Sequence, residues 1–199
     1  MRKMFLLPLI VSCAQASSIV DNTLINISVG PTTVKSLISQ TNNGKIIHIR
    51  PGLSYSVGLG IRRASGFGFM AHSGYKYNRL ERSTSLDIHS GHIHSYDVGI
   101  DAMYHLAARY TMNPYVAVGA GLSNTTSSVN TLTGIHKEKS DTQPVYYLGG
   151  GIEFRLDKHF GIDTQVRHQS TKIRYVQHHD NHKDSLSRNE VRIGLQYAI

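Results

Sequence analysis

The stretch 188-RNEVRIGLQYAI-199 decides the fold, because apolar residues occupy every second position up to the end of the chain. The apolar members of this alternation are Val191, Ile193, Leu195, Tyr197 and Ile199. The polar members include Glu190, Arg192 and Gln196. A period of two places one set on each face of an extended strand, and no helix spaces residues in this way. The stretch therefore predicts a β-strand with one apolar face and one polar face.

The same alternation recurs along the chain and predicts seven further strands. The stretches that carry it are 25–29, 47–61, 67–77, 96–106, 116–122, 146–156 and 160–166. The connections between them alternate in length: residues 63–66, 107–113 and 157–159 are short, whereas 36–44, 82–92, 124–143 and 177–187 are longer and polar. Short turns at one end and long loops at the other are typical of bacterial outer-membrane barrels with both termini on the periplasmic side.

The composition of the two faces indicates which face contacts lipid. The polar face is rich in Gly, Ser and charged residues, which fit the narrow interior of an eight-stranded barrel better than bulky apolar residues do. In hydrocarbon every backbone N–H and C=O needs a partner, and a closed barrel leaves no free edge. We therefore predict an all-β fold, an eight-stranded antiparallel up-and-down transmembrane β-barrel, monomeric and closed by pairing of the last strand with the first.

Charged residues on the inward face form the first candidate site. The set is nearly balanced in sign and comprises Arg50, Asp97, Asp101, Glu153, Arg155, Asp163, Arg167, Glu190 and Arg192. Buried charges persist when they are paired, so we predict an ion-paired plug. The alternative is a narrow, gated ion path, since an eight-stranded barrel is too thin for a general diffusion pore. On the outer face we expect girdles of aromatic side chains at the membrane interfaces, formed by Tyr55, Tyr75, Tyr77, Tyr96, Tyr104, Tyr146 and Tyr197.

The N-terminus carries an export pattern. Arg2 and Lys3 precede the apolar run 4–11 and the small-residue pattern Ala14-Gln15-Ala16, which predicts a signal peptide over residues 1–16 and a barrel domain over 17–199. As an alternative, residues 10–13 resemble a bacterial lipobox, which would make Cys13 a lipidated N-terminus. The formal net charge of +8 is scattered along the chain rather than clustered, so we expect no nucleic-acid partner.

Three stretches carry a family resemblance: 113-NPYVAVGAGLS-123, 146-YYLGGGIEFRLDKHFGIDTQVRH-168 and the C-terminal 188–199. They resemble the strand-turn-strand phrases of the eight-stranded OmpA-like and opacity-type outer-membrane proteins. The resemblance implies a surface-exposed barrel inserted by the outer-membrane assembly machinery, often a host-facing antigen or adhesin with variable loops. Such chains usually end in Phe or Trp, whereas this chain ends in Ile199.

Histidine is concentrated on the long-loop side of the predicted barrel. The weak metal-ligand candidates are His89, His92, His94, His178, His179 and His182. Their spacings are compatible with zinc or copper, or with a gain of charge below about pH 6.5. Structural zinc prefers four ligands on rigid elements, so we favour solvated loop residues and expect neither a metal nor another cofactor.

A second resemblance concerns His168 and Ser170, which share the lipid-facing parity and resemble the His-x-Ser pair of outer-membrane lipid A deacylases. It implies a Ser170 nucleophile, a His168 base and an orienting carboxylate. Glu190 is the nearest acidic residue on the closing strand, but its parity points it inward.

The sequence therefore favours a non-enzymatic surface protein of the outer membrane. Its expected roles are envelope structure and adhesion, or contact with a host or the environment, through the extracellular loops. The basic, His-rich loops could meet anionic lipopolysaccharide or a host-surface glycan. The alternatives are a lipid A deacylase-like esterase and a narrow ion channel.

Overall fold

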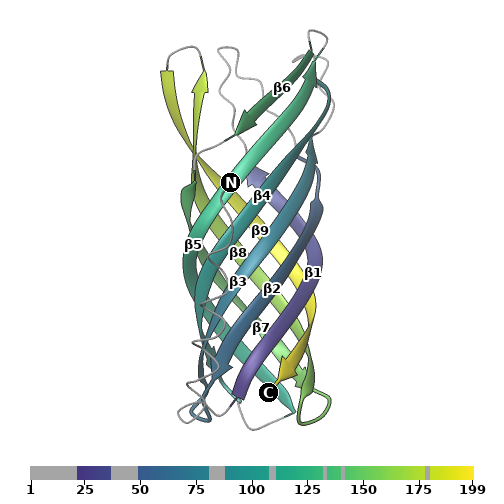
Figure 1. The fold of residues 1–199 in the computed structure, drawn as a ribbon, viewed down its shortest axis with the longest axis vertical. Helices are drawn as coiled ribbons and strands as arrows, with labels where there is room; N and C mark the ends of the chain where they lie inside the picture. Colours follow the sequence, from purple (N-terminus) through teal and green to yellow (C-terminus); the bar gives the residue numbers. More distant parts are fainter. Residues whose placement is uncertain are drawn as a thin grey trace, which may run out of the picture.

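The computed structural model describes residues 22–36, 49–80, 88–107, 111–131, 134–139, 142–177 and 180–199. They form a tall barrel of tilted strands (Figure 1). The strands are β1 (Asn22–Ser36), β2 (Gly52–Arg62), β3 (Phe67–Leu80), β4 (Ile88–His105), β5 (Met112–Thr131), β6 (Gly134–Lys139), β7 (Gln143–Arg155), β8 (Phe160–Gln177) and β9 (Asp180–Ala198). Within this part of the chain, no helix is long and apolar enough to cross a membrane.

Eight of these strands close into a ring in which every pairing is antiparallel. The hydrogen-bonded order is β4-β3-β2-β1-β9-β8-β7-β5, and pairing of β4 with β5 closes the ring. The short strand β6 pairs with the last residues of β5, from Thr126↔Lys139 to Thr131↔Gly134, and forms a hairpin beyond the ring. The predicted eight-stranded antiparallel barrel is confirmed.

The seam between β1 and β9 joins the ends of the barrel domain. Ile27 is paired with Leu195 and Val29 with Ile193, so the apolar positions of the C-terminal strand continue those of the first strand. Below them, Thr23 and Ile199 exchange backbone hydrogen bonds of 3.4 and 2.8 Å. The C-terminal stretch closes the ring against the first strand, as its alternation predicts.

The turns at this end, which we call the terminus-side end, are short. β2 ends at Arg62 and β3 begins at Phe67, which matches the short connection expected from the sequence. Gly66 in this turn has a φ of 91°, and a β-carbon there would approach the His105 carbonyl oxygen to 2.5 Å, so the position requires glycine.

Three of the long loops expected at the opposite end, the loop-side end, are wrong in their extent. The segment expected as a loop over 82–92 includes residues 88–92 of β4. The segment expected as a loop over 124–143 contains the end of β5 and the strand β6, and the segment over 177–187 lies mostly in β9. These residues are polar on both faces and carry no apolar alternation. A β-ladder nevertheless needs only backbone partners, so strand pairing continues where the contrast between the faces ends.

The two faces of the barrel wall reverse the usual distribution of polarity. Apolar side chains point outward and are exposed, with Ile27 at 64% and Leu195 at 65% of their full accessibility. Side chains of the opposite parity are buried inside the ring and are largely polar or charged. A bilayer stabilises an apolar exterior around a charged interior, whereas water favours a polar exterior around an apolar core.

Candidate functional site

The charged lumen is built in three layers, and the first lies at the terminus-side end. Arg62 Nη1 donates a hydrogen bond of 2.7 Å to Glu153 Oε1. Arg155 Nε lies 3.3 Å from the same oxygen, and Asn113 and Gln196 donate further bonds of 3.3 Å to the Glu153 carboxylate. Glu153 is only 2% exposed, so four donors replace the water that this carboxylate loses.

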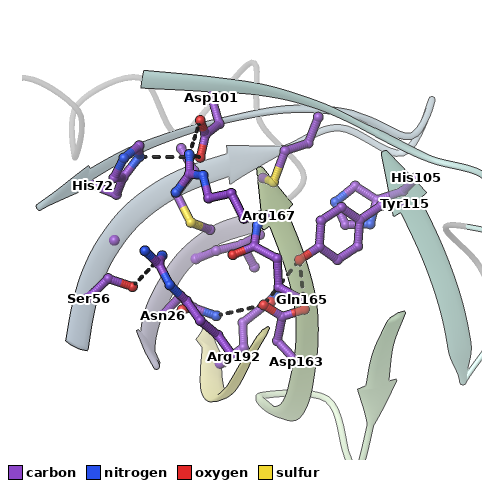
Figure 2. Close-up of a pocket in the computed structure, with 15 residues that line it drawn as sticks. Asn26, Ser56, His72, Asp101, His105, Tyr115, Asp163, Gln165, Arg167 and Arg192 are labelled. Carbon is purple, nitrogen blue, oxygen red and sulfur yellow. Dashed lines mark hydrogen bonds and ion pairs between the residues drawn. The ribbon is translucent and has the colours of Figure 1, made fainter. Parts of the chain in front are cut away.

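The middle layer surrounds the Asp101 carboxylate, which pairs with Arg167 and lies 3.2 Å from His72 Nδ1 (Figure 2). The Arg167 guanidinium also lies 3.9 Å from the centre of the Tyr147 ring, a cation–π arrangement. Asp163 accepts hydrogen bonds of 2.9 Å from Tyr115 and 3.3 Å from Asn26.

The third layer lies towards the loop-side end and centres on Lys76. Its ammonium group contacts Asp97, Glu190 at 2.6 Å, and the side-chain oxygen of Gln169. Glu190 is also paired with Arg192 on the same strand. All these residues except Arg192 are no more than 2% exposed, so the charges compensate one another away from water.

The structure brings eight of the nine lumen candidates to the interior or its terminus-side mouth. The exception is Arg50, which precedes β2 and is exposed, and its backbone N–H bonds the Arg79 carbonyl at 2.9 Å. Sequence reasoning missed Arg62, His72, Lys76, His105 and Arg188, all of which point inward. The signal was available, because Lys76 alternates with Tyr75 and Tyr77.

The free space at the centre of the lumen is small. A cavity of about 20 Å³ is enclosed by side chains that include Asn26, Ser56, Gln165 and Arg192 (Figure 2). This volume accommodates about one water molecule. The side chains of the described strands therefore fill the centre of the barrel.

Apart from Phe69, the aromatic residues described on the outer wall lie at two heights. Three strands each carry two of them: Phe67 and Tyr75, Tyr104 and Tyr96, and Phe154 and Tyr146. The two members of each pair are about 26 Å apart along the strand at about 3.3 Å per residue, or about 19 Å in height at a tilt of about 45°. We call the two levels the terminus-side belt (Phe67, Tyr104, Phe154, Phe160 and Tyr197) and the loop-side belt (Tyr55, Tyr75, Tyr77, Tyr96 and Tyr146).

Within each belt, neighbouring rings contact each other, and the terminus-side belt contains phenylalanines that the sequence analysis did not predict. In the terminus-side belt Phe67 lies 4.8 Å from Tyr104, and Phe160 lies 5.0 Å from Tyr197, measured between ring centroids. In the loop-side belt Tyr75 lies 4.9 Å from Tyr96. Phe67, Phe154 and Phe160 are additions to the seven tyrosines that the sequence predicts for the girdles.

Two of the six histidine candidates have described side chains. His92 and His94 point outward from β4, with ring centroids 4.6 Å apart, and His94 shares a hydrogen bond with the Tyr75 hydroxyl. The side chains of His89, His178, His179 and His182 lie outside the described residues. Within the part of the chain that can be described, no three His, Cys, Asp or Glu residues form a group able to hold a metal.

The histidine of the second resemblance has unexpected partners. His168 Nδ1 lies 2.7 Å from Asn189 Oδ1, and His168 Nε2 lies 3.3 Å from Ser187 Oγ. Ser170 is exposed on the same outer face and is the Cα partner of Ser187. Glu190, in contrast, is buried in the lumen against Lys76, so the structure places an amide rather than a carboxylate beside His168.

The comparisons with known proteins concern both sequence and fold. The family described as "Outer membrane protein beta-barrel domain" matches residues 4–198. Among solved structures, the Neisserial surface protein A is 18% identical, with 88% of this chain and 96% of that chain covered and a TM-score of 0.59. No curated protein matches the sequence.

Two further structures share the fold. The attachment invasion locus protein Ail of Yersinia pestis, solved in complex with the heparin analogue sucrose octasulfate, is 17% identical with a TM-score of 0.57 and coverage of 89% and 98%. The outer membrane protein OprG of Pseudomonas aeruginosa is 13% identical with a TM-score of 0.58 and coverage of 90% and 97%. At these identities the likeness concerns the fold.

Proposed function

Because the chain belongs to the outer membrane protein beta-barrel domain family, we propose that it is a surface protein that binds anionic polysaccharide at its loop-side end. In this proposal the barrel is an anchor. The binding surface consists of the segments that leave the membrane, and the paired charges of the lumen hold the wall in one shape.

The filled lumen is the observation that carries this proposal. The described strands place paired charges at three levels along the barrel axis, and the central cavity has room for about one water molecule. A solute that entered the barrel would have to break several buried ion pairs, so a role at the outer surface is favoured over a role in transport.

The charge of the loop-side segments supports an anionic ligand. Taken together, the segments 35–50, 79–87, 124–143 and 172–185 contain ten Lys and Arg and six Asp and Glu, and the excess comes from 35–50 and 172–185. Five of the twelve histidines of the chain lie in these segments. The exposed Arg79 marks the level at which β3 leaves the loop-side belt. Ail, which shares the fold, was solved with a sulfated heparin analogue.

The same proposal assigns roles to the N-terminal segment and to the two aromatic belts. Residues 1–16 serve as a signal peptide, and the barrel domain over 17–199 is delivered to the outer membrane by the assembly machinery. The two aromatic belts lie at the two membrane interfaces, where the ring edges meet lipid headgroups and lipopolysaccharide.

The experiment is binding of the refolded mature protein, in lipid nanodiscs, to immobilised heparin and to uncharged dextran. We expect retention on heparin alone, and weaker retention as the salt concentration rises. The double variant Arg79→Glu with Arg82→Glu should reduce retention. Its matched control is Arg63→Glu with Lys158→Glu, which reverses two exposed charges at the terminus-side end. Equal retention of both variants, or no retention of the parent protein, would contradict the proposal.

A further inference from the structure

Three polar side chains on the outer wall are arranged in series between β8 and β9. Asn189 Oδ1 is an acceptor, so the 2.7 Å contact requires His168 Nδ1 to carry the ring proton. In this tautomer His168 Nε2 has a free lone pair and accepts the proton of the Ser187 hydroxyl, 3.3 Å away. The order hydroxyl, imidazole, oriented amide is that of a nucleophile, a general base and the residue that fixes the base.

We propose that Ser187, His168 and Asn189 form an esterase site that hydrolyses ester-linked acyl chains of outer-leaflet lipids. This activity goes beyond the proposed surface binding and uses a different face of the barrel. It also uses a different serine and a different third residue from those expected from the sequence.

The height of the site determines the class of substrate. Ser170, the Cα partner of Ser187, is paired on its other side with Tyr146 of the loop-side belt. His168 is paired with Leu148, which is 65% exposed and lies one step deeper in the apolar band. An aromatic belt marks the boundary between headgroups and hydrocarbon. The ester groups of lipids lie at this boundary, so an ester can reach Ser187 without leaving the bilayer.

The reaction needs only the lipid and water. Ser187 Oγ forms a bond to the ester carbonyl carbon while its proton passes to His168 Nε2. The carbon–oxygen bond to the lipid alcohol then breaks, and the alcohol leaves with that proton, which gives an acyl-serine. Water, deprotonated by His168 Nε2, attacks the acyl carbon, and the fatty acid departs as Ser187 recovers its proton.

Ser170 is suited to a stabilising role in this reaction. Backbone N–H groups in the interior of β8 and β9 are used in the barrel ladder, so a hydrogen bond to the oxyanion has to come from a side chain. The Ser170 hydroxyl faces the same side as Ser187 from the adjacent strand position. We assign it this donor role.

The test uses the refolded mature protein in two kinds of vesicle, one of phosphatidylethanolamine and one containing lipid A. Fatty acid release is followed by mass spectrometry, and the two arms identify which lipid supplies the ester. A fluorophosphonate probe, which labels activated serines, is mapped on the same protein. We expect release from at least one vesicle type and a probe adduct on Ser187.

The variants separate the roles of the residues. Ser187→Ala should abolish both release and labelling, whereas Ser73→Ala, a matched outward serine on β3, should change neither. Ser170→Ala should slow release about a hundredfold while labelling of Ser187 remains. Asn189→Asp should raise the rate about tenfold, since a carboxylate stabilises the imidazolium better than an amide.

Three results would overturn the inference: no release from either vesicle type by protein of folded, heat-modifiable gel mobility, unchanged release in Ser187→Ala, or an adduct on Ser170 instead of Ser187. Retention on heparin is measured on the same preparation. Loss of the esterase proposal therefore leaves the surface-binding proposal intact, and the reverse also holds.

Discussion

Arg62 and Glu153 face each other across the full diameter of the barrel, with 2.7 Å between Nη1 and Oε1. Arg62 is on β2 and Glu153 on β7, and three strands of the ring separate them in either direction. The two residues are 91 positions apart in the chain. Their ion pair therefore connects opposite walls that share no backbone hydrogen bonds.

This pair predicts an asymmetric response to mutation. Glu153→Leu leaves the buried Arg62 guanidinium without its acceptor and should lower the free energy of unfolding by about 3–5 kcal/mol. Adding Arg62→Leu should recover part of that loss, because the most deeply buried uncompensated charge is removed, whereas Arg155, Asn113 and Gln196 still lack their acceptor. Urea unfolding in lipid vesicles measures both values. A double variant less stable than the single variant would contradict the interpretation.

The direction of the apolar face predicts the effect of charge on the outer wall. Ile100 lies midway between Tyr96 and Tyr104 on β4 and is 60% exposed, so Ile100→Arg puts a charge at the bilayer midplane. The expected loss is about 2–4 kcal/mol in the free energy of unfolding. Leu106→Arg, at a comparably exposed site beyond Tyr104, should cost about 0–1 kcal/mol. Equal costs in the same vesicles would argue against a lipid-facing wall.

The packing of the lumen predicts that a side chain at Gly119 destabilises the barrel. A β-carbon at Gly119 would overlap the Asp101 carboxylate and lie 2.6 Å from the Ile100 carbonyl oxygen. Gly119→Ala should therefore cost about 1–3 kcal/mol and lower the temperature at which the folded band is lost in heat-modifiability gels. Gly74→Ala is the matched control, since the nearest atom to its β-carbon is at 3.4 Å. If the two variants melted together, the lumen would be looser than its contacts indicate.

The alternation of polarity was sufficient to predict the eight strands, their faces and the closing seam. Successive residues of a strand face lipid and lumen in turn, and lipid favours apolar residues whereas the lumen favours polar ones. The polarity of each residue therefore indicates which face it lies on. Strand ends beyond the membrane, such as the β5–β6 hairpin, cannot be predicted from the alternation of polarity, because both of their faces are polar. The alternation also does not predict which residues pair across the lumen, because that depends on the stagger of the strands around the ring.

His168 and its partners Ser187 and Asn189 show the same limit for single residues. The sequence places His168 and Ser170 on one face, two positions apart. The contact with Ser187 depends on the register of β8 against β9, in which His168 is paired with Asn189 and Ser170 with Ser187. A shift of the pairing would give His168 different neighbours, and local spacing does not specify the pairing.

The turn between β7 and β8 gives a prediction for acid pH. Asp157 Oδ1 accepts the backbone N–H groups of Phe160 and His159, each at 2.7 Å. These two hydrogen bonds hold the pKa of the exposed Asp157 carboxyl below its usual value of 3.8. The bond from Phe160 has the larger effect on this pKa. Because the folded-state pKa is depressed, the carboxylate stabilises the turn fully above the unfolded-state value and loses this effect as the pH falls through the folded-state pKa.

NMR of the barrel in detergent micelles can follow this transition through the amide resonances of Phe160 and His159. Both should titrate with one midpoint below 3.8, and Asp157→Asn should remove the titration. The amide of Gly66 is the internal control, because it donates to the Arg63 carbonyl at 2.9 Å and has no carboxylate acceptor. A midpoint at or above 3.8 would mean that the hydrogen bonds to Asp157 do not favour its charged form, and the turn would then owe its shape to the strand ends alone.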